Sequence, residues 1–247
     1  MKMRIGVLAA ALLSMMMGTA AQAALQTRLG GLAVYDSDLD VTWLVDANLA
    51  QSESFGVSGI LADGRMTWDK ANEWIAAMNA ASYLGYADWR LPIVVDTGMP
   101  GCDSSYDGGD CGFNVDQAGS EMAHLYHGEL GNLAYFDVDG ESSGCGDGPA
   151  YCLVNAGPFA NLQPENYWSG TAYPADADAG DDDEKAWYFY FASGHQDAIY
   201  KNYGLHVLAL RSGDSAAEAP VVPVPGAIWL FGSALGLIGL VRRRISA

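Results

Sequence analysis

Two apolar segments near the ends of the chain confine the folded domain to the part between them, residues 24–218. Residues 1–23 are typical of a secretory signal peptide, because Lys2 and Arg4 precede an apolar stretch that ends in Ala21-Gln22-Ala23. Near the other end, positions 219–241 carry no charged residue, and this length is sufficient to span a bilayer. We therefore expect an exported domain between the two segments.

Three arginines at positions 242–244 follow the second apolar segment and favour a cytoplasmic C-terminus. The domain ahead of that segment then lies outside the membrane, in agreement with the signal peptide. The predicted organisation is a signal peptide over 1–23, one domain over 24–211, a linker over 212–226, and a transmembrane helix with a basic tail over 227–247.

Composition and charge bound the function of the domain. The chain is 50% hydrophobic and 11% aromatic, which excludes a disordered protein. Residues 24–211 hold seven basic and 28 acidic side chains, a net charge of −21. Nucleic-acid binding needs a basic surface, so the sequence excludes it, and other polyanionic partners are disfavoured.

Four cysteines indicate disulfides, because an exported domain meets an oxidising compartment. The sequence places Cys102 near Cys111 and Cys145 near Cys152, so we predict that each local pair forms one bond, although four cysteines allow three pairings. A structural zinc site is disfavoured because neither pair has the short spacing of zinc-binding cysteines.

Local patterns predict an α+β domain. We expect a hairpin within 30–46, an amphipathic helix over 67–83 with Thr67 as N-cap, and a second helix over 120–130. Short aromatic or aliphatic strands are expected over 167–173, 186–192 and 205–211, with long loops rich in Gly and Asp between the elements.

Several motifs, taken in order, resemble the Lcl C-terminal domain family, which is named for a bacterial collagen-like surface adhesin. They are Thr42-Trp43-Leu44, Asp88-Trp89-Arg90-Leu91-Pro92, Tyr167-Trp168-Ser169-Gly170-Thr171 and Leu208-Ala209-Leu210-Arg211. The resemblance covers residues 30–211 and implies a single C-type-lectin-like domain with no established catalytic residues. It also implies a glycan-binding adhesin, although the acidic surface argues against sulfated glycans.

The tail resembles the PEP-CTERM type of bacterial sorting signal. The motif Val222-Pro223-Val224-Pro225 stands ahead of the apolar segment and the basic end. The resemblance implies processing by an exosortase-type enzyme and delivery to the cell surface or extracellular matrix. A permanent membrane anchor remains the alternative.

Two polar motifs are interpreted as structural. In Asp88-Trp89-Arg90-Leu91-Pro92 we expect the arginine to pair with a carboxylate and to fix a rigid corner. Glu121 and His124 have the spacing of a di-iron motif, with His127 nearby, but such a site needs a four-helix bundle. We therefore expect Glu121, His124 and His127 to form a solvated face of the second helix.

Calcium is the one cofactor that the sequence suggests. The acidic segment 176–184 supplies Asp176, Asp178, Asp181 and Asp183, and a second cluster comprises Asp36, Asp38 and Asp40. The segment does not match an EF-hand, so a solvated acidic loop is the competing interpretation.

Aromatic alternation over 187–191 predicts one buried face and a second face that carries Tyr188 and Tyr190. Together with Tyr203, these side chains form a candidate sugar-stacking surface, unless both faces of the strand are buried. Gln163-Pro164-Glu165-Asn166 is similar to the sugar-binding loop of calcium-dependent lectins, but the companion motif is missing, and we interpret the match as chance.

The sequence therefore predicts an exported, non-enzymatic surface or matrix protein that binds a polysaccharide or another surface protein. The alternatives are a structural matrix component without a specific ligand, and an enzyme whose site has no recognised motif.

Overall fold

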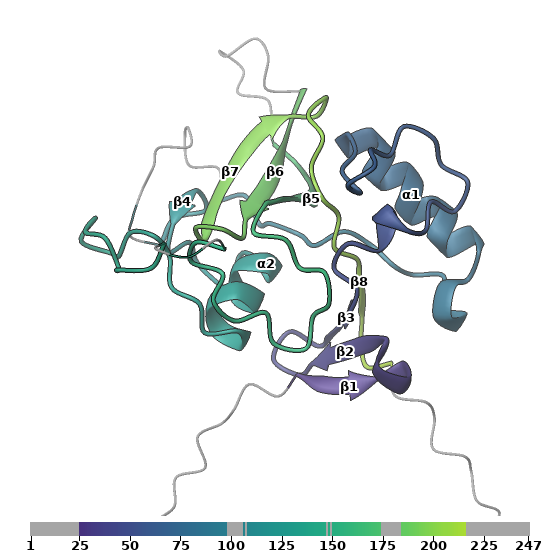
Figure 1. Cartoon of the computed structure of the whole chain (residues 1–247), viewed down its shortest axis with the longest axis horizontal. Coiled ribbons are helices and arrows are strands. Elements are labelled where there is room, and N and C mark those ends of the chain that lie inside the picture. The colour runs from purple at the N-terminus through teal and green to yellow at the C-terminus, as the bar shows by residue number, and fades with distance from the viewer. Residues whose placement is uncertain are drawn as a thin grey trace, which may run out of the picture. The chain divides into compact units, whose positions relative to one another are not determined.

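The computed structural model describes residues 25–97, 106, 108–146, 148, 150–173 and 184–215. Residues up to Asp214 belong to one compact unit, and the second unit, 215–247, lies almost wholly outside the described residues. The described residues of the first unit form two antiparallel sheets and two helices, which confirms the α+β class (Figure 1).

The first sheet joins the beginning of the described chain to its end. Its strand order is β1 (Gln26–Arg28), β2 (Ala33–Asp36), β3 (Val41–Leu44) and β8 (Leu210–Ser212). Strands β2 and β3 form the predicted hairpin, in which Val34 pairs with Trp43. On its other edge β3 pairs with β8, where Trp43 lies opposite Leu210.

The second sheet contains two strands that the sequence did not predict, β4 (Gly112–Phe113) and β7 (His195–Tyr200). Its order is β4, β7, β6 (Lys185–Tyr190) and β5 (Asn166–Ala172). The expected strand over 205–211 is wrong in extent, since only its last residues pair in β8. Strand β7 begins His195-Gln196-Asp197 and lacks apolar alternation, but the turn at Gly194 (φ 67°) returns it onto β6.

Helix α1 (Trp68–Ala80) forms as the sequence predicts. The Thr67 side chain accepts a hydrogen bond from the Lys70 amide at the N-terminus. A helix of this length is only marginally stable by itself, so most of its stability comes from burial of its apolar stripe. The buried residues of that stripe are Ala71, Trp74, Ile75 and Met78. Three short 3₁₀ helices lie at Leu29–Gly31, Leu49–Gln51 and Tyr83–Gly85.

The second helix departs from α geometry after one turn. It begins as α2 (Glu121–Ala123), with Ser120 accepting from the Ala123 amide, and continues as a π-helix over His124–Glu129. The Leu130 amide bonds the Leu125 carbonyl, five residues back, at 2.9 Å. This wider turn changes which side chains share a face.

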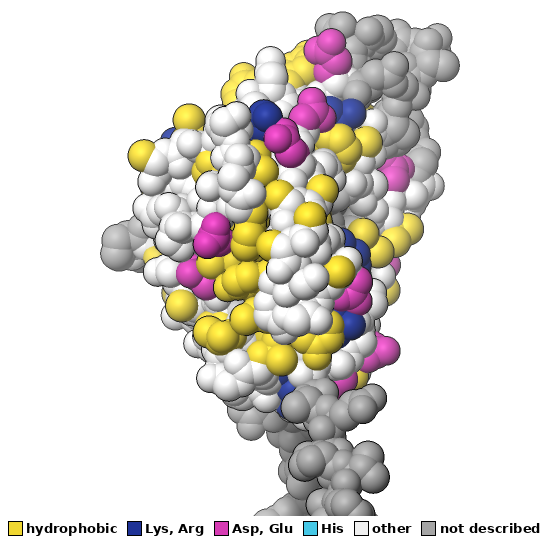
Figure 2. Space-filling view, turned by 90° about the vertical axis from the view of Figure 1, so that its right-hand side faces the viewer, with side chains coloured by type: hydrophobic (Ala, Val, Ile, Leu, Met, Phe, Trp, Pro, Cys, Tyr) yellow, Lys and Arg dark blue, Asp and Glu magenta, His cyan; other side chains and the backbone are white. Residues whose placement is uncertain are grey.

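Five buried tryptophans, together with buried tyrosines and phenylalanines, fill the core. One cluster lies around Trp43, Tyr126, Tyr167, Phe189 and Phe191, and a second packs α1 against Trp168 and Trp89. The face of the domain that carries α1 presents hydrophobic side chains gathered in its middle, with acidic and basic groups scattered around them (Figure 2).

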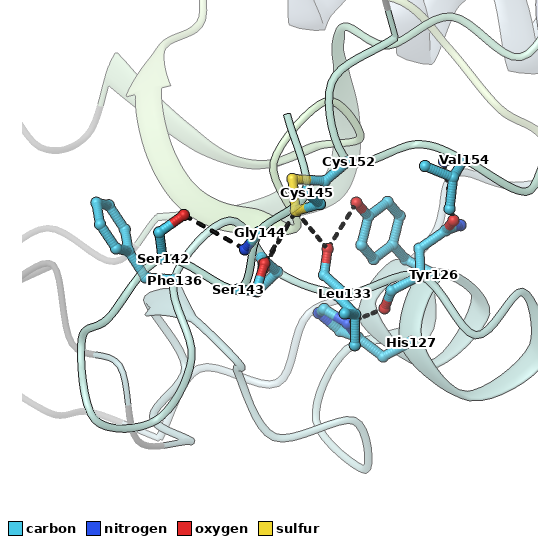
Figure 3. The surroundings of a disulfide bond; sticks show 12 residues. Tyr126, His127, Leu133, Phe136, Ser142, Ser143, Gly144, Cys145, Cys152 and Val154 are labelled. Carbon is cyan, nitrogen blue, oxygen red and sulfur yellow. Dashed lines mark hydrogen bonds between the residues drawn. A yellow bond between two sulfur atoms is a disulfide. The ribbon is translucent and has the colours of Figure 1, made fainter. Parts of the chain in front are cut away.

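A disulfide joins Cys145 to Cys152, as the sequence predicts (Figure 3). Cys152 is fully buried, and its amide donates a hydrogen bond of 2.8 Å to the carbonyl of Ala192, just after β6. The disulfide therefore fastens the loop that carries Cys145 to this part of the second sheet. Cys111 is also disulfide-bonded, and its predicted partner, Cys102, lies outside the described residues.

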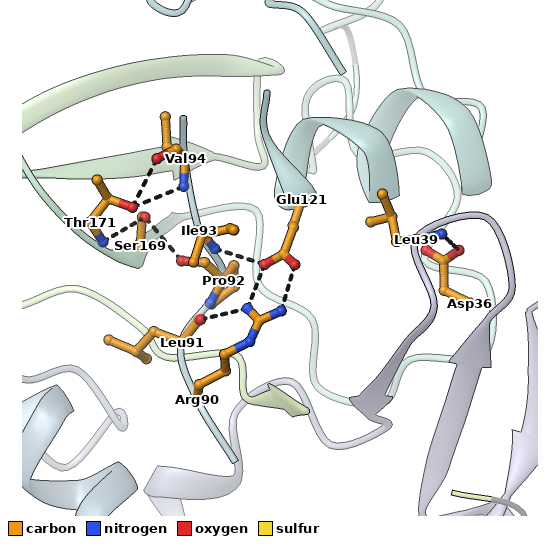
Figure 4. Close-up of polar contacts among 10 residues, drawn as sticks. All are labelled: Asp36, Leu39, Arg90, Leu91, Pro92, Ile93, Val94, Glu121, Ser169 and Thr171. Atoms are coloured by element: carbon orange, nitrogen blue, oxygen red, sulfur yellow. Dashed lines mark hydrogen bonds and ion pairs between the residues drawn. The ribbon is translucent and has the colours of Figure 1, made fainter. Parts of the chain in front are cut away.

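The segment 88–92 is a corner held by two ion pairs. In each pair the partner residue is distant in sequence. Arg90 donates two hydrogen bonds of 2.7 Å to Glu121, which also accepts the Ile93 amide (Figure 4). Asp88 instead pairs with Arg211 at 2.8 Å, and that guanidinium covers the Tyr86 ring. The expected solvated face is therefore wrong: the Glu121 and His124 side chains are only 11% and 17% exposed, and Nε2 of His127 is buried.

The backbone after Arg90 is bonded to the second sheet. Ser169 donates to the Pro92 carbonyl at 3.0 Å, and Thr171 both donates to and accepts from the backbone of Val94 (Figure 4). Leu91 is buried beneath this contact. The two motifs Asp88–Pro92 and Tyr167–Thr171 thus contact each other as structural elements.

The predicted signal peptide, the motif Val222–Pro225, and the predicted transmembrane helix with its basic tail over 227–247 lie outside the described residues. Within the part of the chain that is described, none of the helices combines the length and apolar character required to cross a membrane.

Candidate functional site

A polar cavity of about 420 Å³ opens where four segments of the chain meet. The 3₁₀ helix after β3, the loop before α1, the segment before β5 and the segment between β7 and β8 each contribute side chains. Its lining consists of amide, carboxylate, guanidinium and imidazole groups, from Asn48, Gln51, Asp63, Arg65, Gln163, Glu165 and His206.

Asn48 and His206 form the buried floor of this cavity. The Asn48 amide nitrogen donates to the Gln51 side chain at 3.3 Å and to the Asp63 carbonyl at 3.1 Å. Its oxygen therefore faces His206 Nδ1, 3.2 Å away, so the imidazole carries its proton on Nδ1. The other ring nitrogen, Nε2, is left as an acceptor.

Asp63 and Arg65 form the charged rim. Arg65 Nε donates to the Asp63 carboxylate at 2.8 Å, and this hydrogen bond holds the pKa of Asp63 below its usual value. The tight turn between them requires Gly64, which has φ +91° and whose added Cβ would lie 2.2 Å from Asn48 Oδ1. The turn therefore places the charged pair directly beside the buried amide.

Gln163 and Glu165 complete the cavity from the segment before β5. Gln163 donates to the Asn161 carbonyl at 2.8 Å, whereas the carboxylate of Glu165 is exposed and makes no hydrogen bond among the described residues. The cavity thus offers free acceptors beside a paired guanidinium. Such a set matches a ligand with neighbouring hydroxyl groups, each of which both donates and accepts hydrogen bonds.

The structure brings together only two of the three predicted tyrosines. Tyr188 and Tyr190 are half-buried and point to the same side of β6, opposite Trp187 and Phe189, which are buried. Burial raises the pKa of both tyrosines. Tyr203 is 53% exposed in the turn after β7, and no ring contact among the described residues joins it to the other two.

Of the two candidate calcium clusters, only the one at Asp36, Asp38 and Asp40 lies within the described residues. Asp176, Asp178, Asp181 and Asp183 lie outside the described residues. In the other cluster, Asp36 caps its own turn by accepting from the Asp38 amide, while Asp40 accepts from the Tyr35 hydroxyl at 2.8 Å. The Asp36 and Asp40 carboxylates thus make separate contacts and the Asp38 side chain is exposed, so the structure does not gather the three into one calcium site.

The chain was compared with known protein families and with curated proteins. No family model and no curated protein matches it.

Sequence reasoning missed most of the cavity. Gln163 and Glu165 belong to a segment interpreted as a chance match, and Asn48, Asp63, Arg65 and His206 carry no motif. One signal was available: His206 is the single polar residue of the otherwise apolar stretch 205–210, a pattern that indicates a buried, hydrogen-bonded side chain.

We expect His206 to make the domain less stable in acid. Burial lowers the pKa of this imidazole to about 4, against about 6.5 in an unfolded chain. The unfolded state therefore binds the proton first, and stability falls as the pH drops from about 6.5 towards 4, by about 3 kcal/mol. Urea unfolding of the wild type and of His206→Gln at several pH values measures this term. The variant, whose amide can still donate to Asn48, should lose that part of the acid dependence; an unchanged dependence would contradict the assignment.

Proposed function

We propose that the chain is an exported, non-enzymatic surface or matrix module that binds neutral carbohydrate in the polar cavity. The observation that supports this most directly is the lining itself, in which seven polar side chains converge from four segments. Carbohydrates are recognised by such sets of planar amide and charged groups, because each hydroxyl needs both a donor and an acceptor.

Charge favours a neutral ligand over an acidic one. Asp63 and Glu165 place two carboxylates in the cavity against one guanidinium, and that guanidinium is already paired with Asp63. The domain as a whole is strongly acidic, so a polyanionic glycan would meet repulsion as it approaches. Tyr190 lies close to this site, because it is paired across strands β5 and β6 with Asn166, the residue after Glu165.

Export and surface delivery are part of the proposal. The signal peptide, the PEP-CTERM-like tail and the resemblance to the Lcl C-terminal family support it, and the Cys145–Cys152 bond suits an oxidising compartment. An exosortase-type enzyme would be the processing partner of the tail, with Val222–Pro225 as its recognition motif. The C-type-lectin-like fold is part of the same proposal.

Titration calorimetry of the protein recovered from the cell surface or culture medium tests the proposal, and its mass reports whether both ends are processed. Neutral oligosaccharides drawn from bacterial matrix polysaccharide should bind, and a heparin oligosaccharide should not. Glu165→Ala should weaken the binding about tenfold, as expected for a lost hydrogen bond to a charged group.

Glu141→Ala is the matched control, because Glu141 is also an exposed glutamate but lies on the loop after Phe136. Equal affinity of Glu165→Ala and Glu141→Ala would remove the cavity from the proposal. Failure of every neutral glycan to bind the wild type would favour a matrix component without a specific ligand.

A further inference from the structure

Three ionisable side chains meet beside the π-helix, away from the polar cavity. His124 Nε2 lies 3.4 Å from Glu129 Oε1 and 3.8 Å from Asp36 Oδ2. One atom from each side chain falls within 4.8 Å of the others, and no other such group of His, Cys, Asp or Glu occurs among the described residues. None of the three takes part in the function proposed above.

These atoms are buried and have no hydrogen-bond partner. Asp36 Oδ2, His124 Nε2 and both oxygens of Glu129 are unpaired among the described residues. The Asp36 and Glu129 side chains are 0% and 1% exposed, so water does not solvate them from the outside. Buried polar atoms are nearly always paired, and two facing carboxylates without a cation repel each other. Even a protonated His124 would supply one positive charge against two carboxylates, so the cluster is short of positive charge.

The surrounding structure orients each group towards the others. Asp36 lies at the end of β2, and its Oδ1 accepts the amides of Asp38 and Leu39 at 3.0 and 3.1 Å, which turns Oδ2 towards the helix (Figure 4). His124 and Glu129 are five residues apart, and the π-helix brings residues of this spacing towards the same side. On a regular α-helix they would point in widely different directions.

We propose that Asp36, His124 and Glu129 bind a divalent transition-metal ion of the zinc class. Zinc bonds imidazole nitrogen and carboxylate oxygen at about 2.0–2.2 Å, so two ligands at a tetrahedral angle lie roughly 3.4 Å apart. The measured separations of 3.4 and 3.8 Å agree with that spacing. The imidazole ligand disfavours calcium, which takes oxygen ligands.

A cation here would link two parts of the fold that are distant in sequence. Asp36 belongs to the hairpin of the first sheet, whereas His124 and Glu129 belong to the helix that packs against the aromatic core. Three protein ligands leave a fourth position for water or another donor.

Calorimetry with zinc chloride and the whole exported protein tests this site. The wild type should bind one ion and unfold at a higher temperature in its presence. Glu129→Gln should weaken zinc binding at least about 100-fold, the upper end of what loss of a supporting residue costs a metal site. Glu141→Gln, the same change at an exposed position, should leave zinc binding unchanged.

Metal-free stability separates a ligand from a merely structural residue. Without metal, Glu129→Gln should be as stable as the wild type or more stable, because it removes one of two facing buried carboxylates. His124→Gln should likewise lose zinc binding, and Co²⁺ bound to the wild type should show visible d–d absorption that both variants lack. Equal zinc affinity in wild type and Glu129→Gln, or no binding of zinc, cobalt or manganese to the wild type, would overturn the proposal.

Discussion

Glu121→Ala should lower the free energy of unfolding by about 3 kcal/mol, the lower end for removal of one partner of a buried ion pair, because the Arg90 side chain is 30% exposed and that of Glu121 11%. Glu121 accepts two hydrogen bonds from Arg90 and one from the Ile93 amide, all of 2.7 Å. The alanine variant leaves the guanidinium and the amide without these acceptors. Chemical denaturation of the oxidised protein measures the change.

The exposed pair Lys70–Glu73 on α1 provides the control. Its side chains are 34% and 51% exposed, so Glu73→Ala should cost no more than about 1 kcal/mol. A double-mutant cycle of Arg90→Ala and Glu121→Ala should also show strong coupling between the two side chains. A small effect of Glu121→Ala, similar to that of Glu73→Ala, would contradict the buried position of the pair.

Trp168→Ala should destabilise the domain by about 3–5 kcal/mol, because it empties a large volume of the core. Trp168 is fully buried, its indole nitrogen donates to the Met66 carbonyl at 2.9 Å, and its amide bonds the His206 carbonyl. The variant should also loosen the segment before β8 that carries His206, so ligand binding in the cavity should weaken together with stability.

Tyr203→Ala is the control for that experiment. Tyr203 is an aromatic residue that is 53% exposed, and its removal should change stability by roughly 0.5 kcal/mol or less. Equal stability of the two variants would contradict the buried position of Trp168 in the cluster around α1. If Trp168→Ala kept full ligand affinity, the cavity would not depend on this part of the core.

Local elements were predictable where one physical signal dominates. The spacing of Ala71, Trp74 and Met78 predicts α1 because an amphipathic stripe has only one way to be buried. Thr67 predicts its start for an equally local reason, the capping of a free amide. The hairpin of β2 and β3 and the Cys145–Cys152 bond also join residues that are near in sequence.

The sites were not predictable because their groups meet only through tertiary structure. Glu121 was assigned to solvent, since the sequence does not indicate that Arg90 lies opposite it. Glu129 was missed for a different reason: regular α periodicity separates it from His124, and only the π-turns bring the two together. His206 meets Asn48, 158 positions away, through the packing of β8 and its neighbouring segment.

The pairing of β3 with β8 also has a consequence for the order of events during synthesis. Thr42 donates to the Gly213 carbonyl across 171 positions, so the first sheet keeps an open edge until the final strand has emerged. Contacts of such long range form slowly, and a chain that is still being made cannot form them at all. The first sheet is therefore completed only once nearly the whole described chain has been synthesised.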